Sequence, residues 1–320
     1  MKRAISGVVL GLGVFLLVVA ALVRFYAVPN LVKIPLDQNV SSVSEATGAT
    51  YLDLSTLSIK TDQNLRATRE IRGDVKASSK DTVVFDAFVR VENIADGSLV
   101  SGTTDRVALD RRNAQAVRCC NEAVDSKPTV HTGLSYTFPM GTEQKTYQFF
   151  DTTVSKPFPI SYRGTEQVKG LKTYRFEQEI SEQPIGTQEV PGALVGQPNE
   201  LAVQVEQLYS NVRTVWVEPS TGAIVKGQED QLRVLRGTSG SDTTVLAAKI
   251  AFTDKTVDDS VKRAKDGMAQ AAAVSVIAPL VALILGLILL VIGLVLFVRN
   301  RAAAGAPVGR HDEEQESVRV

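Results

Sequence analysis

Near its C-terminus the chain reads PLVALILGLILLVIGLVLFV, residues 279–298, and this stretch decides the fold class. At about 1.5 Å rise per residue, these twenty uncharged residues cover roughly 30 Å, the thickness of a bilayer core. A buried helix of a soluble protein does not need apolar residues on every face over such a length. The wider charge-free segment 271–298 is therefore predicted to be a transmembrane helix.

A second charge-free run, AISGVVLGLGVFLLVVAALV, occupies residues 4–23 near the N-terminus. Lys2 and Arg3 precede it and Arg24 follows it, so a cleaved signal peptide is an alternative interpretation. The run is longer than a usual signal-peptide core, and no well-placed A-x-A cleavage site follows it directly. We favour an uncleaved transmembrane anchor over 4–23.

The two runs divide the chain into a short N-terminus (1–3), a central domain (24–270) and a C-terminal tail (299–320). The basic residues that flank each run are nearly balanced, so the positive-inside rule does not decide the orientation. A long central segment can be translocated whatever its charge. We expect a two-span plasma-membrane protein with both termini cytoplasmic and the central domain extracytoplasmic.

The central domain shows the alternation of apolar and polar residues that is typical of half-buried strands. Candidate strands lie in 81–93, 160–180, 200–235 and 244–253. Polar stretches at 36–50 and 181–199 are predicted to be loops, and 256–270 is predicted to be a helix. The expected class is α+β, with a β-rich antiparallel, barrel-like domain flanked by two transmembrane helices.

Composition excludes several classes of function. The 35 basic and 35 acidic residues leave no net charge to attract nucleic acid. Two histidines and two cysteines are too few for a zinc ribbon or an iron–sulfur cluster. No phosphate-binding loop, nucleophile elbow or H-E-x-x-H motif occurs. A lone His131 in the central domain is more often a structural residue than a catalytic one, so we predict no enzyme, no cofactor and no metal site.

Cys119 and Cys120 form the most unusual dipeptide of the chain. Thiols outside the cytoplasm tend to be oxidised, and the sequence offers no third cysteine as a partner. A vicinal disulfide is therefore one interpretation. Two reduced buried thiols, or a bridge to another chain, are the alternatives.

Gly7 and Gly11 form a G-x-x-x-G motif in the first apolar run. Small residues at this spacing let helix backbones approach one another closely. The glycines could pack two copies of the chain together, or they could seat the second span, where Gly286 and Gly293 share a face.

Two motifs of the central domain resemble class B scavenger receptors. VKGLKTYRF (168–176) resembles a V-K-G-x-x-x-Y-R-F pattern, and TVWVEPSTGAIVKGQEDQLRVL (214–235) resembles an aromatic-x-V-E-P-x-T-G hairpin. The resemblance implies a membrane-tethered β-rich domain with an apolar tunnel that binds or passes lipids. The several bridging cysteines of those receptors are not found in this chain.

A closer resemblance, over nearly the whole chain, is to the PorA family of actinobacterial two-span envelope proteins. The block GLSYTFPMGTEQKTYQFFD (133–151) is similar to a G-L-x-Y-x-F-P-x-x-T-E-x-K-T-Y-x-x-x-D pattern of that family. A porin needs a closed barrel of lipid-facing strands, whereas apolar helices anchor this chain, so we expect no channel activity.

The expected function is non-enzymatic binding or relay of a lipid or glycolipid in the cell envelope, driven by burial of acyl chains. A scaffold that organises envelope-synthesis enzymes through its spans is the first alternative, and a hydrolase or transferase that uses unidentified carboxylates is the second. Expected partners are membrane lipids or glycolipids and other envelope membrane proteins, not nucleic acid. Residues that could line a lipid cavity are Phe85, Phe88, Phe138, Tyr147, Tyr174, Phe176 and Trp216.

Overall fold

A computed structural model describes residues 2–28, 33–237 and 242–302 of the chain. They fall into two compact units. Residues 1–32 and 270–320 make up the helix unit, and residues 33–269 make up the barrel unit. The tail beyond residue 302, which we expect to be cytoplasmic, lies outside the described residues.

The helix unit contains two helices that are long and apolar enough to cross a membrane. Helix α1 (Lys2–Leu22) continues into a π-helical turn (Val23–Ala27), and a second π-helical turn (Ala273–Ile277) leads into α4 (Ala278–Ala302). The two helices pack closely through glycines. A Cβ added at Gly13 would lie 2.9 Å from the backbone nitrogen of Leu290, and one at Gly293 would lie 2.7 Å from a side-chain carbon of Leu10.

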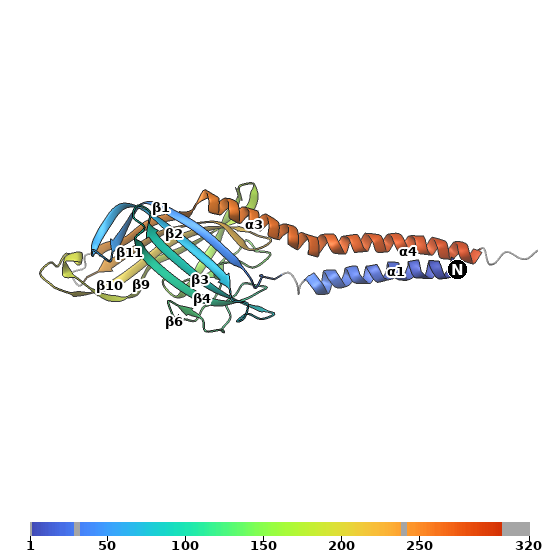
Figure 1. The fold of residues 1–320 in the computed structure, drawn as a ribbon, viewed down its shortest axis with the longest axis horizontal. Coiled ribbons are helices and arrows are strands. Elements are labelled where there is room, and N and C mark those ends of the chain that lie inside the picture. The colour runs from blue at the N-terminus through green and yellow to red at the C-terminus, as the bar shows by residue number, and fades with distance from the viewer. Residues whose placement is uncertain (1, 29–32, 238–241, 303–320) are drawn as a thin grey trace, which may run out of the picture. The chain divides into compact units, whose positions relative to one another are not determined.

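The barrel unit is built on one curved antiparallel sheet of twelve strands (Figure 1). The strands are β1 (Asn39–Asp53), β2 (Ser58–Gly73), β3 (Thr82–Asn93), β4 (Leu99–Asp110), β5 (Ala123–Val124), β6 (Lys127–Pro128), β7 (Tyr147–Asp151), β8 (Lys156–Val168), β9 (Leu171–Val190), β10 (Val203–Glu218), β11 (Ala223–Arg236) and β12 (Asp242–Phe252). Their order is β6-β5-β4-β3-β2-β1-β12-β11-β10-β9-β8-β7. The predicted α+β class with a β-rich, barrel-like domain and two apolar helices is confirmed.

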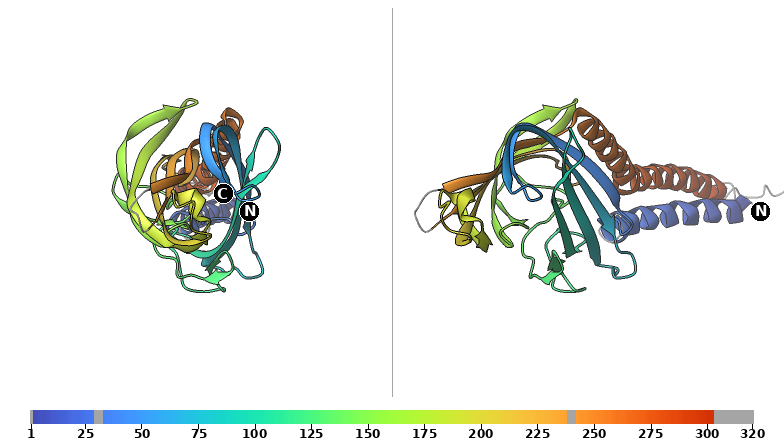
Figure 2. Two further views of the ribbon diagram at one scale, coloured as in Figure 1. Left: turned by 90° about the vertical axis from the view of Figure 1, so that its left-hand side faces the viewer. Right: turned by 60° about the vertical axis from the view of Figure 1, so that its left-hand side comes forward.

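A connecting segment, residues 115–134, joins the two sides of the curved sheet (Figure 2). Its start bridges to β4 through Leu109 and Ala116, and its end bridges to β7 through Leu134 and Phe149. Gly133 makes the second approach possible, because its φ is +79° and a Cβ there would lie 2.5 Å from the carbonyl oxygen of Gln148. Only glycine fits so close to another backbone in this conformation.

Apolar side chains on the inner face of the sheet form the main core of the barrel unit. Its fully buried aromatic members include Phe85, Phe138 and Phe176, with Val215 and Val217 from β10 beside them. A smaller cluster lies on the opposite face of β10, where Trp216 packs with Val257 and Val261 of α3 (Asp254–Ala272). The sheet thus has an inner face with an aromatic core and an outer face that α3 covers in part.

Two predicted loops are strands instead. Residues 39–53 form β1, although 36–50 was expected to be a loop, and β9 extends to Val190 into the expected loop 181–199. In β1 the residues on the same face as buried Ala46 are small, among them Ser42 and Ser44. A strand whose inward positions are Ser and Ala carries no apolar alternation, so the pattern that identifies strands is missing there.

Candidate functional site

A ladder of polar side chains lines the inner face of β10 and β11. Three directly opposed pairs form it: Tyr209 with Arg233, Asn211 with Gln231, and Arg213 with Glu229. The β10 members alternate along the strand with outward residues and lead directly into Val215 and Val217 of the aromatic core. The strand period therefore places these charged and polar groups inside the barrel unit.

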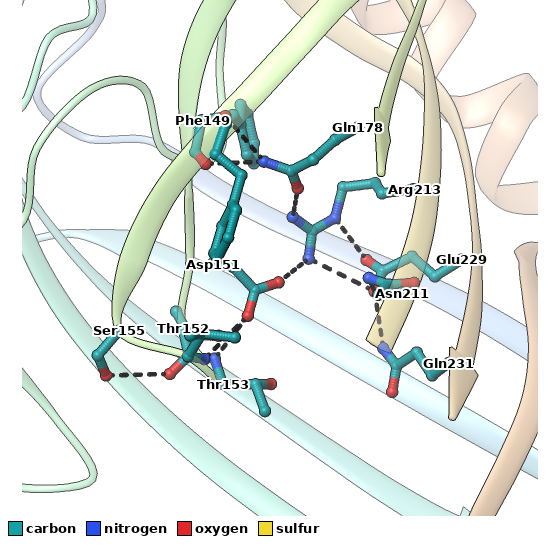
Figure 3. Close-up of polar contacts among 12 residues, drawn as sticks. Phe149, Asp151, Thr152, Thr153, Ser155, Gln178, Asn211, Arg213, Glu229 and Gln231 are labelled. Carbon is teal, nitrogen blue, oxygen red and sulfur yellow. Dashed lines mark hydrogen bonds and ion pairs between the residues drawn. The ribbon is translucent and has the colours of Figure 1, made fainter. Parts of the chain in front are cut away.

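Arg213 lies at the end of this ladder next to the aromatic core, and its guanidinium contacts three other strands (Figure 3). It donates to Asp151 Oδ2 at 3.0 Å, to Glu229 Oε1 at 3.1 Å and to Gln178 Oε1. Glu229 also accepts from Asn211 Nδ2 at 3.0 Å and from Gln231 Nε2 at 2.7 Å. Asp151 accepts two further backbone N–H groups at the β7–β8 turn, so both carboxylates are well satisfied.

The charges of this cluster hold one another in the ionised form. Burial opposes ionisation of Glu229, but the Arg213 and Arg69 guanidiniums and the hydrogen bonds outweigh it and lower the pKa of Glu229 to about 2. Burial likewise opposes the charge of Arg213, yet Glu229 and Asp151 raise its pKa above the ordinary value. A buried ion pair of this kind is stable only while all partners are present.

His131 forms a second buried cluster, at the end of the connecting segment 115–134. Its side chain is fully buried, with Nε2 2.8 Å from Asp105 Oδ1 and Nδ1 3.1 Å from Glu122 Oε2. Tyr136 donates its hydroxyl to the other oxygen of Asp105. Burial lowers the pKa of His131, but the two carboxylates outweigh it, so the pKa is raised above its usual value. Through Asp105, the imidazolium of His131 links the connecting segment to β4.

The stability of the barrel unit should depend on the protonation of His131. Because the folded-state pKa is raised, the imidazolium stabilises the fold fully below the unfolded pKa of about 6.5, and this contribution is lost as pH rises through the folded-state pKa. The free energy of unfolding should fall there by at most about 1.4 kcal/mol per pH unit. Chemical unfolding of the full chain in detergent, followed by Trp216 fluorescence, measures this slope.

The control for that experiment is His131→Gln, which cannot titrate. This variant should be less stable than the natural chain at low pH and should lack the extra slope. An identical slope in both proteins would show that another group titrates in this range.

Cys119 and Cys120 lie in the same connecting segment. The structure joins their sulfur atoms in a disulfide, with the two Cα atoms 3.7 Å apart. Arg106 Nε donates to the carbonyl oxygen of Cys120 at 2.8 Å and its guanidinium pairs with Asp74 and Asp86, so β4 holds the dipeptide in place. The oxidised state of this pair in the cell stays a prediction.

The predicted lipid-cavity residues do not share one place. Phe85, Phe138, Tyr147 and Phe176 belong to the aromatic core and Tyr174 packs against it, whereas Phe88 is 45% exposed and Trp216 contacts α3. Phe138 touches three other rings at centroid distances of 4.7–5.8 Å, so these side chains fill the space between them. None of the seven residues lines either of two surface cavities, of about 320 and 300 Å³, that the structure shows elsewhere.

The glycines of the helix unit are divided between two faces. Gly13, Gly286 and Gly293 lie in the contact between α1 and α4, whereas Gly7 and Gly11 are exposed and a Cβ added to either would meet no atom within 4 Å. The G-x-x-x-G motif therefore does not seat the second helix of the same chain. Its packing role toward another chain stays a prediction.

The family model described as Porin PorA matches residues 5–295, which include the whole barrel unit and most of both apolar helices. The chain belongs to the PorA family. It is 26% identical over 298 residues to "Porin PorA" of Corynebacterium amycolatum, which covers 72% of this chain and 77% of the relative. It is 27% identical over 318 residues to "Porin PorA" of Corynebacterium resistens, which covers 72% of this chain and 76% of that relative.

The comparisons correct the function expected from the sequence. The relatives are named porins, so the expected lipid or glycolipid relay is wrong, and with it the scaffold alternative; the exclusion of channel activity loses its support. That exclusion considered only a lipid-facing β-barrel, but apolar helices of several chains can also enclose a pore. Family and helices together indicate a membrane protein, and the absence of catalysis and the likeness to class B scavenger receptors stay predictions.

Neither acidic pairs nor short motifs of the sequence indicate the charged interior. Arg213 lies in a strand of mostly apolar residues, NVRTVWV (211–217), on the same face as two valines. An arginine at an inward strand position needs a buried carboxylate partner. That alternation is the signal that could have found it.

Proposed function

We propose that this chain forms a membrane channel for small polar or charged solutes and acts without catalysis. The observation that supports this most is the family match, which extends from the first apolar helix through the barrel unit to the second. Both helices would cross the same membrane, so both termini would lie on one side. We propose that this side is the cytoplasm and that the membrane is the plasma membrane.

The outer face of the sheet argues against a pore made from lipid-facing strands. Outward neighbours on β2 and β3 include the pairs Arg66–Glu92 and Arg72–Asp86, together with Arg90 opposite Thr68. A membrane-spanning barrel presents an apolar band about 25 Å tall to lipid, and charges on that band are costly. The charged outer face of the barrel unit therefore fits an aqueous environment outside the bilayer.

The helix unit of one chain offers no room for a pore either. The contacts at Gly13 and Gly293 bring the backbones of α1 and α4 too close together for solutes to pass between them. We infer that the conducting unit contains several copies of the chain, whose helices enclose the pore together. The exposed Gly7 and Gly11 give α1 a face on which another helix can approach closely.

The test is conductance across a planar lipid bilayer after addition of the purified full chain in detergent. Stepwise current increases should appear in the presence of the natural chain and not with detergent alone. Gly11→Leu should lower the number of steps at equal protein concentration at least about tenfold, since a bulky side chain prevents close helix contact.

Val8→Leu is the matched control for this variant. Val8 lies on the same helix and is 70% exposed, but it contributes no small residue to a packing face. Its conductance should equal that of the natural chain. The proposal fails if the natural chain produces no current steps at either polarity of the applied voltage.

A further inference from the structure

In the part of the chain that the structure describes, four buried polar atoms on the inner face of the sheet have no hydrogen-bond partner. They are the hydroxyl of Tyr209, Oδ1 of Asn211, and Nε of Arg69 and Arg233; Oγ of Ser135, outside the strands, is a fifth such atom. Leaving such a group unpaired destabilises the folded state, so unpaired groups that gather on one face need an explanation. Tyr209 and Arg233 are directly opposed on β10 and β11, and Asn211 is the next inward residue after Tyr209.

The charges at this place are unbalanced. Asp151 and Glu229 are bound by Arg213 and by backbone and amide N–H groups, and Asp105 is bound by His131 and Tyr136. Arg69 lies 3.9 Å from the nearest Glu229 oxygen, beyond hydrogen-bond distance. Among the residues that the structure describes, Arg233 has no carboxylate within 4 Å, and its guanidinium only faces the Tyr209 ring, 5.6 Å from the centroid.

The two arginines of this group reach the surface of the barrel unit. The side chain of Arg69 is 36% exposed, and Arg233 and Gln231 are also partly exposed. Tyr209, by contrast, is 99% buried, so its unpaired hydroxyl cannot turn to bulk water. The guanidinium of Arg233 can therefore meet solvent at one end while Nε and the Tyr209 hydroxyl face inward.

We propose that the interior of the barrel unit binds a small anion, a halide or an inorganic oxyanion, between Arg233 and Tyr209. The anion accepts hydrogen bonds from Arg233 Nε and the Tyr209 hydroxyl, and it neutralises the guanidinium that lacks a carboxylate. Arg69 adds a second positive charge on the same inner face. The site does not depend on the proposed channel, because it lies wholly in the barrel unit.

The test uses the full chain in detergent, with thermal unfolding followed by Trp216 fluorescence. Sodium chloride and sodium phosphate are each titrated against sodium gluconate, a bulky reference anion, at constant ionic strength. Chloride, phosphate or both should raise the unfolding midpoint in a saturable way. Stabilisation by chloride alone would identify a halide site, and stabilisation by phosphate would identify an oxyanion site.

Two variants and one control assign the effect to the site. Arg233→Gln should weaken anion binding about tenfold or more, since it removes the charged donor. Tyr209→Phe keeps the ring and the fold but should also weaken anion binding. If the site binds no anion, this variant would leave the unfolding midpoint unchanged or raise it. Arg163→Gln, at an exposed arginine paired with Glu177, should bind as the natural chain does.

The proposal is overturned if chloride and phosphate act no differently from gluconate. It is also overturned if the saturable effect persists at full strength in both Arg233→Gln and Tyr209→Phe. In either case ordered water would be the partner of these buried atoms.

Discussion

Replacing Arg213 by methionine should lower the free energy of unfolding of the barrel unit by about 3–5 kcal/mol. The change leaves Asp151 and Glu229 buried without the cation that both contact. The pKa of Glu229, now about 2, should rise, because burial would no longer be opposed by the guanidinium. Chemical unfolding of the full chain in detergent measures the loss, with Trp216 as the probe.

Trp216 is well suited as the probe because it is the single tryptophan of the sequence and is 6% exposed in the barrel unit. Arg163→Met is the matched control: Arg163 is half exposed and its pairing with Glu177 contributes about 0–1 kcal/mol. Adding Asp151→Asn and Glu229→Gln to Arg213→Met should recover part of the loss, since the unpaired charges are then removed. Equal stability of Arg213→Met and Arg163→Met would show that the buried pairing is not needed.

Replacing Phe138 by alanine should cost a similar amount, about 3–5 kcal/mol. Phe138 is fully buried, and its ring contacts Tyr147, Phe149 and Phe176. The loss combines the transfer free energy of the ring with the cavity that remains. The same unfolding measurement quantifies it.

Phe88→Ala provides the comparison within one residue type. Phe88 lies on the outer face of β3 and is 45% exposed, so its removal should cost clearly less than removal of Phe138. Similar losses for the two variants would contradict the assignment of Phe138 to a packed core rather than to an open cavity.

The helices and the β class were predictable because their signals are local. The uncharged run at 279–298 is longer and more evenly apolar than a buried helix of a soluble protein needs. The alternation of apolar and polar residues over 81–93 corresponds to strand β3. Strand β2 escaped prediction, because polar residues lie on its outer face while Arg69 lies on its inner face. With charges on both faces, a strand shows no hydrophobic period.

The charged interior could not be predicted from sequence spacing. Asp151, Gln178, Arg213 and Glu229 come from four strands, and the two ends of that set are 78 positions apart (229 − 151). Only the order of the strands in the sheet brings them together. The expected function was wrong for a different reason: anchoring by apolar helices excludes a pore made of lipid-facing strands, and that exclusion was extended to every kind of pore.

The number of chains in a conducting unit tests the proposed channel most directly. The full chain, labelled with one fluorophore per molecule, is reconstituted in single vesicles at limiting density, and photobleaching steps are counted alongside ion efflux. Efflux should occur only from vesicles that show several bleaching steps, because the helices of one chain close on each other at Gly13 and Gly293. Efflux from vesicles that show a single step would contradict a pore made of several chains.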